Sequence, residues 1–272
     1  MKLLLLLVLF VVFMCLVRKA CRENYRSEAT GRGLEATGVD RPTKPAREDL
    51  VSNPKVVHLV LYSDSYKEMY EATREYYRSS GVSVYYYSFS DEITTPYEIK
   101  GDRLFLKGQE SYLPGILEKT LKAFAVFPDA DYIIRSNAST VVDIDKVVNE
   151  LKANPVDYAG SYVHTLQWLD PGNGIRDKRY WGTRYASGTC VILSKKAVKH
   201  LLSAKIDKTV IDDVAIGVAL KDFPPRCYLS HFTSIENTPG QPGKWFYRHR
   251  TVDRKKDAER MKILVSKLKT QV

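Results

Sequence analysis

The stretch over residues 129–151 constrains the fold most, because it joins a strand, a polar turn and a helix within a short length of chain. Residues 132–134 form an apolar run typical of a buried strand. Residues 135–140 are polar and mostly small, and Asp143 then occupies an N-cap position before a helical pattern. α/β proteins bind ligands where buried strands end in this way. The sequence therefore predicts an α/β fold with a ligand site after residue 134.

The same alternation of strands and helices continues on both sides of this stretch. Strands are predicted at 56–62, 82–89, 102–108, 157–163 and 224–233. Helices are predicted at 66–79, 109–127, 144–151, 195–202 and 214–220. A chain that opens strand–helix–strand favours a nucleotide-binding half-sheet.

Composition limits the function classes. A chain of 272 residues with 44% hydrophobic residues can form one α/β domain with a full-sized core. The net charge of +10 fits either a solvated basic surface or an anionic partner, such as a nucleotide diphosphate or an anionic membrane. Because no nucleic-acid-binding motif is present, we expect no nucleic-acid partner.

Cysteine spacing argues against a zinc site. Only Cys190 and Cys227 fall in the globular part, and the sequence holds no C-x-x-C motif or Cys/His cluster. The pair forms either a disulfide or two small buried thiols, and we favour the thiols.

The amino-terminal region predicts a membrane attachment. Residues 3–17 are apolar and are followed by Arg18 and Lys19, which favours an uncleaved signal anchor at 1–20 over a cleaved signal peptide. Residues 21–54 lack apolar periodicity and read as a flexible stem. We therefore expect a single-pass membrane protein whose main domain spans 55–250. The basic residues after the apolar run would leave that domain cytoplasmic by the positive-inside rule.

The carboxyl-terminal region predicts a basic helix at 251–272. Apolar side chains recur there at helical spacing, at Met261, Leu264, Val265 and Leu268. This narrow stripe either packs on the domain, which we favour, or lies on an anionic membrane face.

Three further segments carry chemistry. Small residues at 186–188 precede a buried strand and let the backbone approach a ligand. Adjacent acids, Asp212 and Asp213, precede a helix, where they either cap it or supply a catalytic base. The long loop 164–182 carries Trp168 and Trp181, which form either a wall for a sugar acceptor or anchors that pin the loop to the core.

In order and spacing, five blocks resemble the galactosyltransferase/fringe (β-1,3-glycosyltransferase) family. They lie at 110–120, 129–143, 184–194, 211–217 and His231, and the resemblance covers about residues 55–240. The block YASGTCVILS resembles the family's Y-A-S-G-G-G-Y-V-L-S, and DDVAIG resembles E-D-V-x-x-G. The resemblance implies the A-type glycosyltransferase fold, with a mixed, mostly parallel central sheet flanked by helices. It also implies a type II membrane enzyme of the Golgi or endoplasmic reticulum.

The resemblance further implies an inverting glycosyltransferase that moves a sugar from a nucleotide-sugar, such as a UDP-sugar, to a glycan hydroxyl. Asp213 would be the catalytic base, with Asp212 capping the helix or binding the acceptor. The nucleotide-sugar side would comprise Ser63, Asp64, Arg135, Ser136, Asn137 and Ser139. The acceptor or sugar side would comprise Trp168, Trp181, Tyr185, Ser187 and Gly188. Lys119 either lies near the phosphates or, as we favour, pairs with a neighbouring carboxylate.

One departure concerns the metal. Family members carry three aspartates where this chain has Asn137, Ala138 and Ser139, so Mn²⁺ or Mg²⁺ would be held only by His231 and neutral oxygens, which bind it poorly. Either Arg135, Lys119 or the basic tail replaces the metal, which we favour, or Asp129 and Asp131 hold it. Otherwise the protein is an inactive pseudo-glycosyltransferase that binds sugar nucleotides or glycans. A basic membrane-peripheral protein that binds no nucleotide is a further alternative.

The same triplet, residues 137–139, is an N-glycosylation sequon. A glycan there would block the predicted site. Either the segment is buried or the domain never meets the glycosylation machinery.

Overall fold

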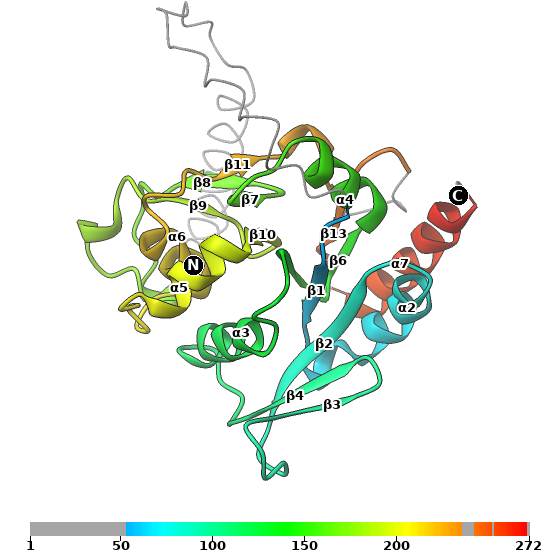
Figure 1. Ribbon diagram of the computed structural model, residues 1–272, viewed down its shortest axis with the longest axis horizontal. Coiled ribbons are helices and arrows are strands. Elements are labelled where there is room, and N and C mark those ends of the chain that lie inside the picture. The colour runs from blue at the N-terminus through cyan, green and yellow to red at the C-terminus, as the bar shows by residue number, and fades with distance from the viewer. Residues whose placement is uncertain (1–52, 236–241, 252, 271–272) are drawn as a thin grey trace, which may run out of the picture. The chain divides into compact units, whose positions relative to one another are not determined.

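A mixed sheet forms the centre of the computed structural model, which describes residues 53–235, 242–251 and 253–270. Its eight strands lie in the order β11-β7-β10-β5-β1-β2-β4-β3 (Figure 1). Their bounds are β1 Val56–Leu61, β2 Ser83–Ser90, β3 Tyr97–Lys100, β4 Arg103–Lys107, β5 Tyr132–Asn137, β7 Tyr158–Gly160, β10 Cys190–Ser194 and β11 Arg226–Cys227. Neighbouring strands are parallel, except that β10 runs antiparallel to β5 and β7, and β3 to β4. The predicted α/β class with a mostly parallel central sheet is confirmed.

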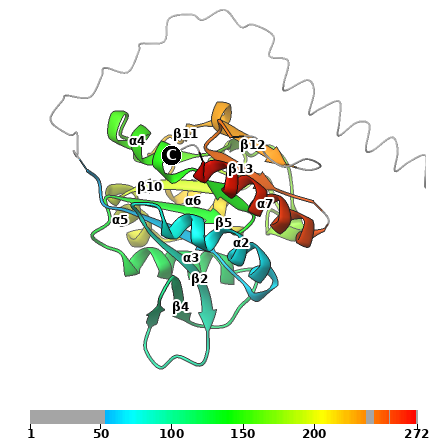
Figure 2. The same cartoon turned by 90° about the vertical axis from the view of Figure 1, so that its right-hand side faces the viewer.

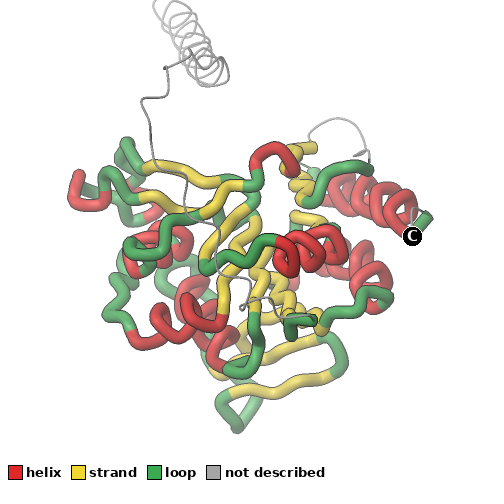
Figure 3. Tube along the Cα trace, turned by 45° about the horizontal axis from the view of Figure 1, so that its top comes forward, coloured by secondary structure: helices red, strands yellow, loops and turns green. Residues whose placement is uncertain are grey.

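Helices cover both faces of this sheet because side chains alternate along the strands. Val57 and Leu59 of β1 lie in the apolar cluster that includes helices α3 Gly115–Val126, α5 Lys195–Ser203 and α6 Asp212–Ala219. Val56 and Val60 face the other way, toward α2 Lys67–Arg78 and α4 Ile144–Ala153. Figure 3 shows the strands in the middle with helices on both sides.

Two smaller sheets extend the centre. One pairs β12 Phe232–Ile235, β13 Phe246–His249 and β6 Thr140–Val142, and the other pairs β8 Val163–Thr165 with β9 Arg184–Ala186. Because β13 runs antiparallel to β6, the carboxyl-terminal part of the chain lies beside the turn that follows β5. Short 3-10 helices complete the described elements, at η2 Asp64–Tyr66, η3 Pro171–Asn173, η4 Lys178–Tyr180 and η5 Leu229–His231.

Most predicted elements are found within a few residues of their expected bounds. Asp143 caps α4 as predicted, since its carboxylate accepts a hydrogen bond from the Lys146 N–H at 3.3 Å. The helix predicted at 109–127 begins later, at Gly115, because the residue before Pro114 is disfavoured in a helix. The strand predicted at 157–163 is divided between β7 and β8, with a bend between them.

The single strand predicted at 224–233 is wrong. The chain leaves the central sheet after β11, turns through η5 and enters the small sheet as β12. The buried ring of Tyr228 sits at this turn, with its centroid 5.3 Å from that of Trp245. Packing at this ring directs the chain toward β13 instead of along β7.

The basic carboxyl-terminal helix is present as α7 Arg254–Lys269. Its apolar stripe, predicted to pack on the domain, is buried in one cluster with Met69 and Ala72 of α2. Figure 1 and Figure 2 both show α7 beside α2. The preferred interpretation is therefore confirmed, and the stripe is not presented to a membrane.

The assignment as an anchored type II membrane protein is corrected. Within residues 53–235, 242–251 and 253–270, no helix is both long and apolar enough to cross a bilayer. The predicted anchor at 1–20 lies outside the described residues, as does the predicted stem at 21–54 apart from its last two residues. The membrane partner and the Golgi or endoplasmic reticulum localisation are therefore withdrawn.

Both cysteines of the globular part are free thiols, so the alternative of a Cys190–Cys227 disulfide is wrong. Cys190 is buried in β10 as expected, whereas Cys227 in β11 is exposed. Cys227 is exposed because β11 lies at the edge of the sheet.

Gly217 lets α6, which carries the acidic pair, lie close against β9. A Cβ atom at this position would lie 2.4 Å from Tyr185 Cβ and 3.1 Å from the Arg184 carbonyl oxygen. We expect Gly217→Ala to lower the free energy of unfolding by about 1–3 kcal/mol, the usual result of overpacking, as measured by urea denaturation. Gly81→Ala is the control, because nothing lies within 4 Å of its added Cβ. Equal stability of the two variants would contradict this packing argument.

Candidate active site

A polar cavity of about 320 Å³ lies where strands β1 and β5 end. Leu61 and Asn137, the last residues of these strands, are paired in register and both line it. The other walls come from the turns 138–139 and 187–189, the amino terminus of α6, β13 and the start of α7. Because the carboxyl ends of parallel strands bind ligands in α/β folds, this cavity is the site expected after residue 134.

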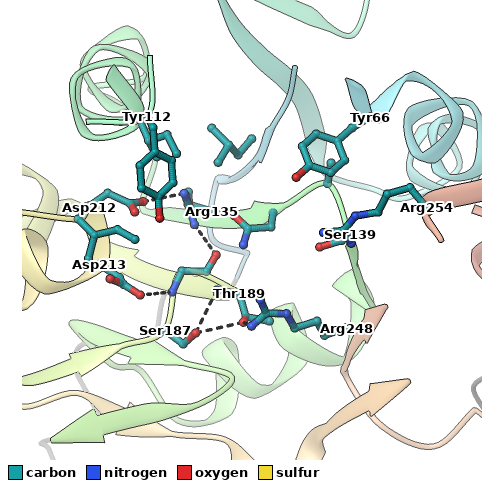
Figure 4. A pocket seen from close by; sticks show the side chains of 16 residues that line it. Tyr66, Tyr112, Arg135, Ser139, Ser187, Thr189, Asp212, Asp213, Arg248 and Arg254 are labelled. Carbon is teal, nitrogen blue, oxygen red and sulfur yellow. Dashed lines mark hydrogen bonds and ion pairs between the residues drawn. The ribbon is translucent and has the colours of Figure 1, made fainter. Parts of the chain in front are cut away.

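Asp212 and Asp213 stand on one side of the cavity, in the first turn of α6 (Figure 4). The buried Asp212 carboxylate accepts a hydrogen bond from Arg135 Nη2 at 2.7 Å. Arg135 also donates to the Gly188 carbonyl oxygen, and the Gly188 N–H donates to Asp213 Oδ2 at 3.1 Å. These contacts link both acids through Arg135 and Gly188.

Arg135 was predicted on the nucleotide side, where its positive charge would have to be free to bind the donor. In the structure that charge is already paired with Asp212. The Arg135 side chain is buried, and burial alone would lower its pKa. Burial is the largest single effect, but the Asp212 carboxylate, Tyr87 and Asp213 together exceed it, so the pKa of Arg135 is raised. The guanidinium is therefore a fixed cation neutralised by Asp212, and it positions the Gly188 backbone beside Asp213.

Asp213 has the properties of a general base. Burial, and then the negative charge of Asp212, raise its pKa to about 6, while hydrogen bonds from the N–H groups of Gly188 and Val214 oppose the rise. The carboxylate is therefore ionised at neutral pH, and its pKa lies close enough to neutrality to accept a proton.

Two arginines stand on the opposite side of the cavity, together with Tyr66 (Figure 4). Arg248 of β13 is paired in register with Thr140 of β6, directly after the 137–139 turn. Its Nη1 donates to Thr189 Oγ1 at 2.6 Å. Arg254 lies in the first turn of α7, with Nη1 3.2 Å from a carboxylate oxygen of the buried Asp257. One wall of the cavity is thus acidic and the facing wall is basic.

Residues 137–139 form the turn between these walls and do not fit Mn²⁺ or Mg²⁺. Such cations prefer carboxylate oxygens, whereas Asn137 and Ser139 offer neutral atoms and Ala138 offers no side-chain ligand. Over the described ranges, no group of three or more His, Cys, Asp or Glu could hold a metal. The sequon formed by this triplet lines the cavity, and Ala138 and Ser139 are buried.

The other predicted metal ligands do not converge on the cavity. His231 is stacked on Trp245, with ring centroids 3.6 Å apart, and does not line the cavity. Asp131 precedes β5 and accepts a hydrogen bond from the Lys55 N–H at 2.8 Å. Asp129, 80% exposed beside Lys195, is at the same end of that strand. Both acids therefore lie at the end of β5 remote from the cavity, where they cannot supply ligands to a metal bound in it.

Three residues predicted on the nucleotide side lie away from the cavity. Ser136 is fully buried, and its hydroxyl lies 2.8 Å from His58 Nε2, because alternate residues of β5 point to opposite faces. Ser63 and Asp64 do not line the cavity, although Tyr66, which follows closely in η2, does. Of the predicted nucleotide side, the structure brings together Arg135, Asn137 and Ser139.

Lys119 pairs with a carboxylate, as favoured from the sequence. Its ammonium lies 2.5 and 2.7 Å from the two Glu110 carboxylate oxygens. Burial lowers the pKa of Lys119, and Glu110 partly restores it. The side chain therefore links α3 to Glu110 and does not line the cavity.

The predicted acceptor residues are divided in the same way. Ser187 and Gly188 line the cavity, whereas the buried Tyr185 packs its ring against His164. Trp168 and Trp181 are 42% and 41% exposed and lie outside the cavity lining. The Trp181 ring instead lies 4.7 Å from the Lys178 ammonium. These tryptophans form no wall of this cavity.

Several lining residues were not identified from the sequence: Tyr66, Tyr112, Thr189, Arg248 and Arg254. The basic tail was predicted as a source of charge, but its individual arginines were not distinguished. Pairing between β13 and β6, which are far apart in the chain, selects Arg248. In the sequence, the one signal for these arginines was a short run of basic and aromatic residues near the end of the chain.

Comparison with known proteins shows likeness in structure alone. No family model matches the chain, and no curated protein matches it. A glycosyltransferase involved in the glycosylation of the major capsid of PBCV-1 is 11% identical, with a TM-score of 0.44, covering 77% of this chain and 100% of that one. A protein assigned as a glucose-1-phosphate thymidylyltransferase from Bacillus anthracis, solved with sucrose, is 10% identical, with a TM-score of 0.43, covering 77% and 95%. Likeness at this level decides neither substrate nor reaction, and neither of these two structures is described as a galactosyltransferase or a fringe protein.

Proposed function

We propose that the protein is an inverting glycosyltransferase that moves a sugar from a nucleotide-sugar, such as a UDP-sugar, to a glycan hydroxyl. One observation carries this proposal. A carboxylate with the pKa of a general base, Asp213, faces Arg248 and Arg254 across a single cavity at the ends of β1 and β5 (Figure 4). Such a site can activate a hydroxyl on one side and hold an anionic leaving group on the other.

The reaction would be a single displacement. Asp213 accepts the proton of the acceptor hydroxyl as its oxygen attacks the anomeric carbon. The bond between that carbon and the phosphate oxygen breaks, and the nucleoside diphosphate leaves from the opposite face of the sugar. The acceptor enters beside Ser187 and Gly188, and the Gly188 N–H already donates to Asp213. Attack from that side inverts the anomeric configuration.

A catalytically inactive protein that binds sugar nucleotides or glycans is the second candidate. The replacement of the expected aspartates by Asn137, Ala138 and Ser139 favours it. In that case the cavity would bind a donor without turnover, which separates the two functions experimentally.

A turnover assay tests the proposal. The full chain is incubated with a panel of UDP-sugars and a mixture of oligosaccharide acceptors, and release of UDP is measured. We expect acceptor-dependent release for at least one donor, with an inverted anomeric configuration in the product by NMR. Binding of UDP-sugars without release would favour the inactive protein. A product with retained configuration would contradict the single displacement.

The pH dependence of transfer should report the ionisation of Asp213. A general base acts only when ionised, and the pKa of this carboxyl is raised to about 6 by burial and by Asp212. We therefore expect kcat/KM to be level above that pH and to fall about tenfold per pH unit below it. A profile that stays level well below the raised pKa would exclude Asp213 as the base.

A further inference from the structure

We propose that Arg248, Arg254 and the 137–139 turn bind the diphosphate of the donor in place of a divalent cation. This inference rests on the proposed nucleotide-sugar donor. It follows from the composition of the site. Cationic side chains line one wall, whereas the described residues hold no group of three or more His, Cys, Asp or Glu that could bind Mn²⁺ or Mg²⁺.

The first argument is the uncompensated charge of Arg248. In the parts of the chain that the structure describes, no carboxylate lies within ion-pairing distance of its guanidinium, and its buried Nε has no hydrogen-bond partner. Burial, and then the charges of Arg250 and Arg254, lower the pKa of Arg248. A guanidinium in this position is stabilised by an anion, and its planar donors match the oxygens of a phosphate.

Arg254 adds a second cation to the same wall. Its partner, Asp257, is fully buried, accepts bonds from the Thr251 N–H, and lies 4.0 Å from Arg260. One carboxylate thus serves several donors, so Arg254 retains donor capacity toward the cavity that it lines. Together Arg248 and Arg254 can offset the two negative charges that the bound diphosphate already carries and stabilise the further charge that forms on its leaving oxygen.

The second argument is the chemistry of the turn. Carboxylates at 137 and 139 would repel a diphosphate unless a cation lay between them. The Asn137 amide and Ser139 hydroxyl can instead donate hydrogen bonds directly to phosphate oxygens. Both residues line the cavity, and neither side chain is hydrogen-bonded to another described residue. The neutral turn and the facing arginines therefore both favour direct binding of a diphosphate.

Calorimetric titration of the full chain with UDP, and separately with pyrophosphate, tests this inference. We expect the same Kd in EDTA and in Mn²⁺ for the unsubstituted protein. Arg248→Gln should weaken both ligands by about tenfold to 100-fold, the range for a charge-assisted hydrogen bond. Arg184→Gln, an exposed arginine of β9 outside the cavity, is the matched control and should bind like the unsubstituted protein.

The outcomes separate this inference from the proposed function. Binding of UDP that is lost in EDTA and restored by Mn²⁺ would overturn the arginine site and leave the proposed donor standing. Pyrophosphate binding that depends on Arg248, without any binding of UDP or UDP-sugars, would support the anion site and refute the donor class. If Arg248→Gln does not fold, Arg248→Lys, which keeps the charge and loses the planar fork, should show an intermediate Kd.

Discussion

Asp213→Asn is expected to lower kcat/KM for sugar transfer by about 10²- to 10⁴-fold, the usual contribution of a general base. The substitution keeps the size of the side chain and an oxygen that can accept from the Val214 N–H, which now donates to Asp213 Oδ1 at 2.9 Å. It removes the group that takes the acceptor proton. The measurement is the initial rate of product formation with the donor that the unsubstituted protein uses.

Binding of the donor separates loss of chemistry from loss of the site. The Kd for UDP should change little in Asp213→Asn, because the basic wall is intact. Asp222→Asn, at an exposed position outside the cavity, controls for the substitution itself and should retain full activity. Full turnover by Asp213→Asn would refute the proposed mechanism. A large loss of UDP affinity would instead place Asp213 in donor binding.

The acidic wall was predictable because its parts are local in sequence. Asp212 and Asp213 begin a helix, and helix geometry alone separates the directions of two adjacent side chains. Residues 186–188 are small, and Gly188 lies where an added Cβ would be 3.0 Å from Arg135 Nη1. The strand that ends at residue 137 was likewise visible as an apolar run followed by polar residues. Short-range patterns therefore identified the edge of the sheet and the acidic pair that lines the cavity.

The basic wall was not predictable from such patterns. Arg248 reaches the cavity only because β13 pairs with β6, and neither strand is long enough to show a periodicity of its own. Ser136 was misplaced for the opposite reason, since it neighbours lining residues in sequence but points into the core toward His58. The tryptophans of the long loop were assigned from composition alone, and composition does not fix the direction in which a loop folds.

Arg135→Met is expected to lower the free energy of unfolding by about 3–5 kcal/mol, because it leaves the Asp212 carboxylate buried without its cation. Arg135 Nη2 lies 2.7 Å from that carboxylate, and both side chains are almost inaccessible to water. The variant also loses the bond to the Gly188 carbonyl oxygen and the one from Nε to the Tyr87 hydroxyl at 3.3 Å. Urea denaturation of the purified variants gives the change directly.

A double-mutant cycle with Asp212→Asn isolates the ion pair from those other losses. Each single variant leaves one buried charge unpaired, whereas the double variant Arg135→Met with Asp212→Asn leaves none. The loss in free energy of unfolding should therefore be smaller in the double variant than the sum of the two single losses, by about 0.5–3 kcal/mol. Arg184→Met, at an exposed arginine outside the cavity, should change stability by less than about 0.5 kcal/mol. Strict additivity would mean that the pair contributes little and that Arg135 acts mainly through Gly188. In that case Arg135→Lys provides the test, because it keeps a charge near Asp212 but lacks the planar donors that reach Gly188. Asp213 would then no longer be held against the Gly188 N–H. We expect this variant to lose transfer activity while retaining most of its stability.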